Sequence, residues 1–288
     1  MKIARFNDNR LGLVQGDEIL DVTSALDVLP AHKYPAPTTD QLIYNLDMLK
    51  PRILSAAQTA TKYPVSGVKL LSPVANPGKV VAAPVNYQAH YDEAEFDPGI
   101  RHGKEIVKIQ TIGLFLKATS SVVGMSHGVE LVHLDRRNDH EIELVAVIGK
   151  AARNVKKENA LDYVAGYCIG LDMTVRGAEE RSMRKSIDTF TVMGPWMVTP
   201  DEIADPHNLD LNLTVNGQPR QNNNTKNLII KIHELIEWAS IYYTLHPGDL
   251  FMTGTPDGVG PVVPGDKIDA RITSLVSMQV DVRAQKVG

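Results

Sequence analysis

Residues 139–150, DHEIELVAVIGK, place two glutamates at the start of a run that otherwise predicts a buried strand. The run is too short to cross a membrane and is rich in β-branched residues, which favours a strand over a helix. Side chains alternate between the faces of a strand, so Glu141 and Glu143 share a face with Val145 and Val147. Their carboxylates are then about 7 Å apart along the strand, at roughly 3.3 Å per residue. Because burying unpaired charge is costly, a positive group is expected beside them.

The composition is that of a soluble globular protein, with 288 residues, 43% hydrophobic and 22% charged. A net charge of −4 gives no basic surface of the kind that nucleic acids or anionic membranes require. No stretch is apolar for long enough to span a membrane, and the start MKIARFNDNR lacks the apolar centre of a signal peptide. Cys168 is the only cysteine, which excludes an intrachain disulfide and a thiolate zinc cluster. We therefore expect a cytoplasmic protein without a nucleic-acid or membrane partner.

The chain divides into two expected domains. Residues 1–72 predict a small β-rich domain, because MKIARF, LGLVQG and EILDVT are short strand-like runs separated by turn residues, and a helical stretch follows at about 39–60. The Pro- and Gly-dense segment LSPVANPGK at 71–79 marks the boundary, and residues 73–288 form the second domain. There, one long amphipathic helix is expected over residues 227–245. The expected strands of this domain are GLFLK, SSVVG, VELVHL, EIELVAVIG, YVAGYCIGLDMTV, GPWMVT and LDLNLTVNG. This is an α+β chain rich in β structure, neither an alternating βαβ fold nor a helical bundle.

A third acidic residue lies in a similar setting. The run YVAGYCIGLDMTV (163–175) is apolar apart from Asp172. On pattern alone, the two glutamates could belong to the solvated face of an edge strand, and Asp172 could be a turn former. Taken together, three carboxylates without Cys or His at fixed spacing suit a hard cation, Mg²⁺, Mn²⁺ or Ca²⁺, better than zinc.

Four motifs resemble those of the fumarylacetoacetate hydrolase family: HEIELVAVIG (140–149), GYCIGLDMT (166–174), KSIDTF (185–190) and TGTPDGVG (253–260). The resemblance implies a β-roll catalytic domain, a bound Mg²⁺ or Mn²⁺ and a homodimer. Within the family, the chain is most similar to bacterial acylpyruvate hydrolases and to 2-hydroxyhepta-2,4-diene-1,7-dioate isomerases. By this resemblance Glu141, Glu143 and Asp172 are the metal ligands, and the cation is the positive group that the buried carboxylates require.

The family also carries a His-x-x-Glu pair in a lid helix, and PVNYQAHYDE (84–93) supplies His90 and Glu93. Residues three apart share a helix face, so the carboxylate can orient the imidazole as a base. Without the resemblance, the pair is better explained as a solvated helix face beside Asp92 and Glu95.

Two lysines are expected at the site. Lys185 in KSIDTF resembles the family cation that meets an anionic substrate, although its cluster with Arg181 and Arg184 is by itself typical of a solvated face. Lys117 in GLFLK resembles a second family lysine, and its alternative is a strand-end lysine whose stem covers apolar surface.

Two further residues are candidate substrate ligands. Thr255 lies on a Gly-rich loop whose backbone N–H groups could bind a carboxylate, and this loop lacks the Lys-Ser/Thr ending of a phosphate loop. Arg176 is either a substrate ligand or an ordinary surface arginine. The sequence departs from the family pattern at Gly177, where the family often has Asp, and in a longer polar insert at 97–110. These departures leave the identity of the substrate open.

The resemblance implies hydrolysis of the C–C bond of an acylpyruvate, a small anionic 2-oxo acid such as fumarylpyruvate or maleylpyruvate. The cation would hold the substrate's carboxylate and 2-keto oxygen, His90 would activate a water, and pyruvate would leave as an enolate stabilised by the cation. A 5-carboxymethyl-2-hydroxymuconate isomerase and an oxaloacetate decarboxylase pass through related enolates, so both remain alternatives. A metal-stabilised binding protein without turnover is the third hypothesis. It would need the carboxylates but not His90, Glu93 or Lys185.

Overall fold

Strand β10 (Ile142–Ile148) lies inside the largest sheet and is buried along its whole length. The computed structural model describes residues 1–103 and 105–285. The two faces of β10 contribute to different apolar clusters: Ile142 and Leu144 belong to one, and Val145 and Val147 to the other. The expectation that both faces are apolar is therefore confirmed. Glu143 lies on this strand, whereas Glu141 precedes it, in the short gap after β9 (Asn138–His140).

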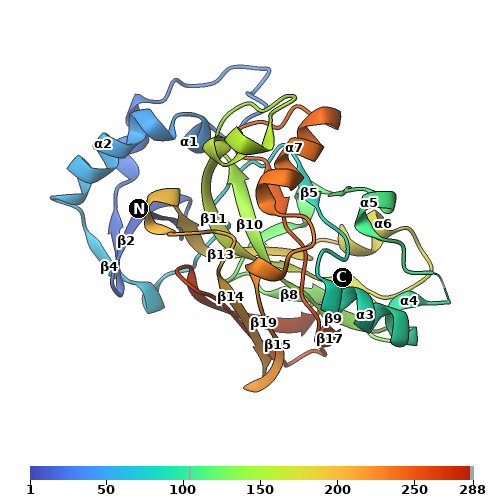
Figure 1. The fold of residues 1–288 in the computed structure, drawn as a ribbon. Coiled ribbons are helices and arrows are strands. Elements are labelled where there is room, and N and C mark those ends of the chain that lie inside the picture. Colours follow the sequence, from blue (N-terminus) through green and yellow to red (C-terminus); the bar gives the residue numbers. More distant parts are fainter. Residues whose placement is uncertain (104, 286–288) are drawn as a thin grey trace.

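The largest sheet in the described part of the chain has eleven strands and runs through the whole molecule (Figure 1). Its order is β4, β3, β2, β1, β13, β11, β10, β16, β5 and β6, and β7 pairs with β13. Most neighbours are antiparallel, but β5 is parallel to β16 and β7 is parallel to β13. The strands other than β10 are β1 (Lys2–Phe6), β2 (Arg10–Gln15), β3 (Glu18–Asp21), β4 (Lys62–Pro64), β5 (Val80–Ala82), β6 (Phe115–Lys117), β7 (Val122–Gly124), β11 (Val164–Asp172), β13 (Thr191–Val198) and β16 (Leu250–Met252).

Two smaller sheets complete the β structure. A five-stranded sheet has the order β15 (Gln218–Asn224), β14 (Asp210–Val215), β18 (Lys267–Ile272), β19 (Val276–Ala284) and β8 (Val129–Leu131). A three-stranded sheet has the order β12 (Thr174–Val175), β9 and β17 (Gly260–Pro261). Strands β15, β18 and β19 are not among those expected from the sequence. Strand β15 reads QPRQNNN and exposes most of its side chains at the sheet's edge, so it carries no apolar alternation that would reveal it.

The helices of the described residues are α1 (Gln41–Tyr44), α2 (Leu46–Ala57), α3 (Gln88–Phe96), α4 (Pro98–Arg101), α5 (Ile109–Ile112), α6 (Arg181–Lys185) and α7 (Ile232–Tyr242). Helices α3 to α6 gather at the end of the molecule away from α1 and α2 (Figure 1). None of them has the length and apolar character needed to cross a bilayer.

Helix α7 is shorter than the expected range 227–245, and local hydrogen bonds explain its start. The Glu234 carboxylate accepts the Lys231 N–H at 3.0 Å, which caps the first turn. The Asn86 side chain pairs with both the N–H and the C=O of Ile230, at 2.9 Å each. These contacts use backbone groups that a longer helix would need, so the helix begins at Ile232.

The N-terminal strands form the expected meander, in which β1 pairs with β2 and β2 with β3. Strand β1 also pairs antiparallel with β13, through Lys2 with Val198 and Ile3 with Met197. The sheet of the N-terminal unit is thus continuous with that of the rest of the chain, and the boundary at residues 72 and 73 stays a prediction. The α+β, β-rich class expected from the sequence is confirmed. Cys168 is a buried core residue, as expected.

Candidate active site

Three buried carboxylates converge where β10 and β11 pair. The Asp172 N–H donates to the Glu141 carbonyl at 2.8 Å, which fixes the end of β11 beside the start of β10. One carboxylate oxygen each of Glu141, Glu143 and Asp172 lies within 4.8 Å of the others. The three residues are 4%, 2% and 1% exposed. An all-oxygen donor set of this kind suits Mg²⁺ or Mn²⁺.

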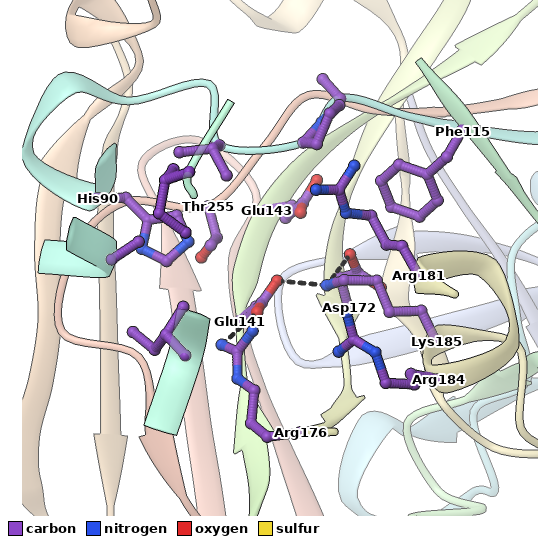
Figure 2. Close-up of a pocket in the computed structure, with 16 residues that line it drawn as sticks. His90, Phe115, Glu141, Glu143, Asp172, Arg176, Arg181, Arg184, Lys185 and Thr255 are labelled. Carbon is purple, nitrogen blue, oxygen red and sulfur yellow. Dashed lines mark hydrogen bonds and ion pairs between the residues drawn. The ribbon is translucent and has the colours of Figure 1, made fainter. Parts of the chain in front are cut away.

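Two lysines reach these carboxylates from different elements. Lys185, at the end of α6, donates from Nζ to Glu141 Oε2 and to Asp172 Oδ2, each at 2.7 Å (Figure 2). Lys117, at the end of β6, donates to Asp172 Oδ1 at 2.5 Å and is buried, so it is not a strand-end lysine that reaches solvent. Burial lowers the pKa of the Lys117 ammonium, and the charge of Asp172 works in the opposite direction.

Glu143 is the carboxylate with the fewest positive contacts. The Gly254 N–H donates to its Oε2 at 2.7 Å, and its Oε1 has no hydrogen-bond partner among the described residues. Burial raises the pKa of Glu143 well above its ordinary value, and the neighbouring Asp172 charge adds to the rise. Burial acts in the same direction on Glu141, but Lys185 and Arg176 outweigh it and lower the pKa of Glu141. The site therefore has one carboxylate oxygen left for a further cation.

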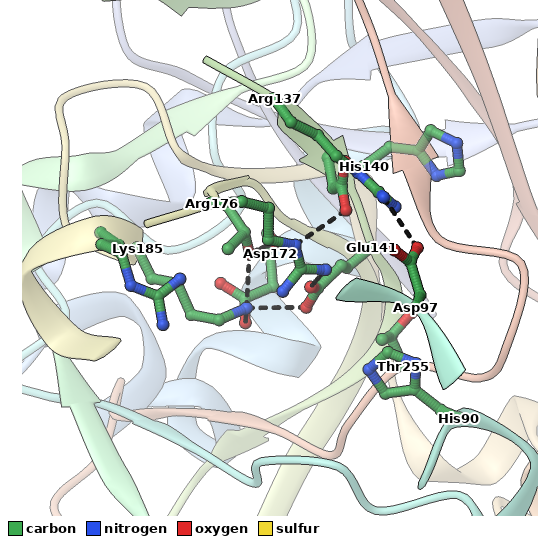
Figure 3. Close-up of polar contacts among 12 residues, drawn as sticks. His90, Asp97, Arg137, His140, Glu141, Asp172, Arg176, Lys185 and Thr255 are labelled. Atoms are coloured by element: carbon green, nitrogen blue, oxygen red, sulfur yellow. Dashed lines mark hydrogen bonds and ion pairs between the residues drawn. The ribbon is translucent and has the colours of Figure 1, made fainter. Parts of the chain in front are cut away.

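A chain of ion pairs connects the carboxylates to the turn between α3 and α4 (Figure 3). Arg176 donates from Nη2 to Glu141 at 2.9 Å and from Nε to Asp139 at 2.8 Å. Arg137 then joins Asp139 to Asp97, at 2.7 Å on either side. Since Arg176 is buried, its interpretation as an ordinary surface arginine is wrong.

His90 and Glu93 form the expected pair on α3. His90 Nδ1 lies 2.9 Å from Glu93 Oε2, and the Gly258 N–H donates to Glu93 Oε1 at 3.0 Å. The carboxylate thus ties the imidazole to the TGTPDGVG loop. His90 is 4% exposed, so the interpretation of the pair as a solvated helix face does not hold for it. With Nδ1 protonated and donating to Glu93, Nε2 is left to accept a proton.

The pocket brings together most of the residues predicted from the sequence. Its lining includes His90, Glu141, Glu143, Asp172, Arg176, Lys185 and Thr255 (Figure 2). Glu93 and Lys117 stand behind this surface, one bonded to His90 and the other to Asp172. Arg181 and Arg184 also line the pocket, so the cluster around Lys185 is not simply a solvated face.

Gln221 is a site residue that the sequence did not indicate. It lies on β15, is 1% exposed, and donates from Nε2 to Thr255 Oγ1 at 2.8 Å and to the Pro256 carbonyl at 2.9 Å. Its Oε1 accepts the Ile142 N–H at 3.1 Å. Gln221 thus fixes the Thr255 loop against the start of β10. Nothing in the local sequence distinguishes it from the polar residues around it.

The fold and the site define the class of protein, and the chain belongs to the fumarylacetoacetate hydrolase family. The family profile described as fumarylacetoacetate (FAA) hydrolase C-terminal matches residues 79–283. This confirms the family that the four sequence motifs indicate.

Two relatives resemble the chain over nearly its whole length. It is 56% identical, over 286 residues that cover 99% of this chain and 100% of the relative, to maleylpyruvate hydrolase from Aquipseudomonas alcaligenes. It superposes on the crystal structure of maleylpyruvate hydrolase from Sphingobium sp. SYK-6, in complex with manganese(II) and pyruvate, with a TM-score of 0.85 and 40% identity, covering 99% of this chain and 100% of that one. A more distant relative is the mitochondrial oxaloacetate tautomerase from Xenopus laevis, 39% identical over 201 residues that cover 68% of this chain and 60% of the relative.

Proposed function

We propose that this protein hydrolyses the carbon–carbon bond of an acylpyruvate with the help of a divalent cation. The observation that carries the proposal is the convergence, in one buried pocket, of a three-carboxylate cation site with His90, which Glu93 orients. The two maleylpyruvate hydrolases that the chain resembles support it, because one of them was solved with manganese and pyruvate.

Glu141, Glu143 and Asp172 fit a hard cation, and we propose that they hold Mg²⁺ or Mn²⁺. Their oxygens are close together and buried, and Glu143 Oε1 has no other partner among the described residues. Ca²⁺ also accepts carboxylate oxygens, so the donor set alone does not select among the three ions. When bound, the cation supplies Lewis-acid polarisation of the substrate's oxygens.

His90 is proposed as the general base. Its Nε2 takes a proton from water while Glu93 stabilises the imidazolium that forms, an arrangement that typically contributes about 10²–10⁴-fold to the rate. The water oxygen bonds to the 4-keto carbon of the substrate, and the electron pair of the C=O π bond moves to the 4-keto oxygen. When that C=O bond re-forms, the bond between carbons 3 and 4 breaks and its electron pair passes to the pyruvate half as an enolate. The proton held by His90 goes to carbon 3 to give pyruvate, and the acyl half leaves as a carboxylic acid.

Lys185 is proposed to bring positive charge to the pyruvate half of the substrate. It lies between Glu141 and Asp172 and also donates to Thr174 Oγ1 at 2.6 Å, so its ammonium is held in a fixed position. A preorganised charge of this kind stabilises negative charge that develops during the reaction without reorganising at that moment. Thr255 and Arg176 line the same pocket and are proposed to contact the substrate.

The tautomerase relative favours a second candidate function, isomerisation of a related 2-oxo diacid. That reaction also passes through an enolate but adds no water and releases no pyruvate. Decarboxylation of oxaloacetate would release pyruvate together with CO₂. The three reactions therefore differ in their products.

The test is an assay of the protein with Mg²⁺ or Mn²⁺ on maleylpyruvate, fumarylpyruvate and oxaloacetate. We expect one pyruvate and one carboxylic acid for each acylpyruvate consumed, with one oxygen of the new acid derived from ¹⁸O-labelled water. Interconversion of enol and keto oxaloacetate without any cleavage of acylpyruvates would contradict hydrolysis and favour the second candidate. The homodimer implied by the resemblance and the cytoplasmic location expected from the composition remain predictions.

A further inference from the structure

A second, larger cavity (the outer chamber) adjoins the pocket that holds the carboxylates (the inner chamber) and shares part of its lining. The inner chamber has a volume of about 80 Å³, and the outer chamber about 330 Å³. Both are lined by Val85, Ile100, Ile106, Phe115, Arg181 and Arg184. The shared lining places the larger cavity beside the carboxylates, on the side of Arg181.

Arg181 lines both cavities, and its positive side chain has no hydrogen-bond or ion-pair partner in the described part of the chain. It is the first residue of α6 and is only partly exposed, and its guanidinium carbon lies 5.5 Å from the centre of the Phe115 ring. The neighbouring Glu180 carboxylate accepts the Ser182 N–H at 2.6 Å and caps the helix. Burial lowers the pKa of Arg181, but an arginine stays charged at neutral pH.

The other two arginines of the inner chamber are already engaged. Arg184 donates from Nε to the Glu179 carbonyl at 3.0 Å and from Nη1 to the Val175 carbonyl at 3.2 Å. Arg176 is paired with Asp139 and Glu141. Arg181 is therefore the arginine available to an anionic group that enters the pocket.

Arg181 and Lys185 are one helical turn apart and lie on the same face of α6. Lys185 Nζ lies 5.9 Å from the centre of the same Phe115 ring, but only Arg181 also lines the outer chamber. The helix thus presents one cation to the buried carboxylate site and a second cation to the wall that this site shares with the adjoining cavity. Two cations placed one after the other along α6 match a substrate that has an anionic group at each end.

We propose that Arg181 binds a carboxylate at the far end of the acyl group and so makes the protein selective for dicarboxylic acylpyruvates. The inference rests on the proposed function and adds the class of acyl group. Arginine suits the role because its planar fork of N–H donors pairs with both oxygens of a carboxylate.

The first experiment compares kcat/KM for maleylpyruvate, which has the second carboxylate, with that for acetylpyruvate, which lacks it. A hydrogen bond to a charged group contributes enough that Arg181→Met should lower kcat/KM for maleylpyruvate by about 10–100-fold. Acetylpyruvate should change by less than about threefold, because it makes no contact with Arg181. Arg181→Lys should recover part of the preference. Lys108→Met, which removes an exposed charge from the segment beside the outer chamber, is the control for a general change in charge and should leave the preference unaltered.

Equal losses for both substrates in Arg181→Met would overturn the inference, because they would show that the residue only supports α6 and Lys185. An unchanged maleylpyruvate rate would overturn it as well. If the wild-type protein cleaved neither substrate, the proposed function would be the part that failed.

A binding measurement tests Arg181 without turnover. Calorimetric titration of the Mn²⁺-loaded protein with maleate, the acid released from the acyl half, should give a Kd at least about tenfold higher in Arg181→Met. Oxalate, which resembles the pyruvate half, should bind both proteins alike. Equal maleate affinities would remove Arg181 from the substrate site whatever reaction the protein catalyses.

Discussion

At Glu143 the protein buries a carboxylate that has one backbone donor and, among the described residues, no direct cationic partner. Glu141 and Asp172 differ, because lysines contact both of them. A buried charge without a partner costs stability, and a cation at this position would remove that cost.

Glu143→Gln should therefore have opposite effects with and without metal. The metal-free variant should be as stable as the metal-free wild type or more so, because an amide needs no counter-charge and can still accept the Gly254 N–H. Stabilisation by Mn²⁺ should be lost. The rate of pyruvate release should fall at least about 100-fold, which is more than the loss expected for a residue that only supports a metal ligand. Thermal unfolding with and without Mn²⁺, together with the pyruvate assay, gives both values. Glu95→Gln, at an exposed position, is the matched control. A variant that is less stable without metal yet still stabilised by Mn²⁺ would contradict the assignment.

A substitution at His90 should impair catalysis without affecting metal binding. His90→Gln should lower kcat by about 10²–10⁴-fold, the usual contribution of a general base. Stabilisation by Mn²⁺ should be unchanged, because His90 is not one of the proposed ligands. Steady-state kinetics gives the change in kcat, and thermal unfolding of the same preparation gives the stabilisation by Mn²⁺. Activity within about threefold of wild type would mean that another group activates the water.

Local sequence and the family resemblance together predicted residues that the structure gathers in and behind one pocket, but not the partners of those residues. Strand geometry predicts that Glu141 and Glu143 share a face, whereas His90 and Glu93 were singled out by the family resemblance, and helix geometry adds only that they share a face. Gln221 could not be found in this way, because its role depends on strand β15 lying against residues far away in the sequence. The same holds for Arg181, whose lack of a partner is visible only once α6 is placed beside Phe115.

Between elements, the ion pair of Asp97 and Arg137 ties the turn after α3 to the strand that leads to Glu141. Asp97 also caps α4 by accepting the Gly99 N–H at 2.7 Å. The pair is partly exposed, with side chains 30% and 26% accessible, so solvent weakens it.

Asp97→Asn keeps the cap and removes the charge, so it isolates the ion pair. Since partly exposed pairs contribute up to about 1 kcal/mol, we expect kcat/KM to fall by no more than about fivefold, through looser placement of α3 and His90. The increase in thermal stability on adding Mn²⁺ should be the same in the variant as in the wild type. Arg137→Met also breaks the contact with the buried Asp139, so it should cost more by itself, and Asp97→Asn should add nothing further once Arg137 is replaced. Additive losses in a double-mutant cycle would show that the two residues act independently.

At the same scale, most of the strands with long apolar runs were predicted from the sequence, whereas the polar strand β15 and the alternating strands β18 and β19 were not. Strands β10, β11 and β14 carry runs whose burial follows from their composition. Strand β15 is held in the sheet by its pairing with β14 rather than by its own apolar residues. Its polar composition by itself therefore predicts a loop. The position at which helix α7 begins likewise depends on a residue far away in the sequence, because Asn86 binds the backbone of Ile230 just before the helix.

Over the whole molecule, the N-terminal unit and the rest of the chain share a sheet and an apolar cluster. Ile3, Leu13 and Leu20 lie in the same cluster as Met193 and Val145, and Val145 is on the strand that carries Glu143. The sequence predicted two units because a Pro- and Gly-rich segment separates them. It could not predict the pairing of β1 with β13, which joins residues almost 200 positions apart.

A chain that begins at residue 73 should therefore be much less stable than the complete protein. Exposing several core side chains costs about 1.5–3 kcal/mol each, and the freed edge of β13 would become a template for aggregation. We expect the midpoint of thermal unfolding to fall by more than about 10 °C, or the protein to be insoluble. An unchanged midpoint would show that residues 73–288 fold independently, in agreement with the predicted boundary.

The central claim is that the three buried carboxylates form an open cation site that binds 2-oxo acids, and thermal unfolding of metal-stripped protein tests it most directly. Mn²⁺ or Mg²⁺ should raise the stability, and oxalate should raise it further only when the metal is present. A ligand at a hundredfold excess over its Kd adds about 2.7 kcal/mol. A metal effect that oxalate does not extend would instead indicate a closed structural site. The absence of any metal effect would contradict the account at its centre, because the lysines and arginine that contact these carboxylates would then be their only partners.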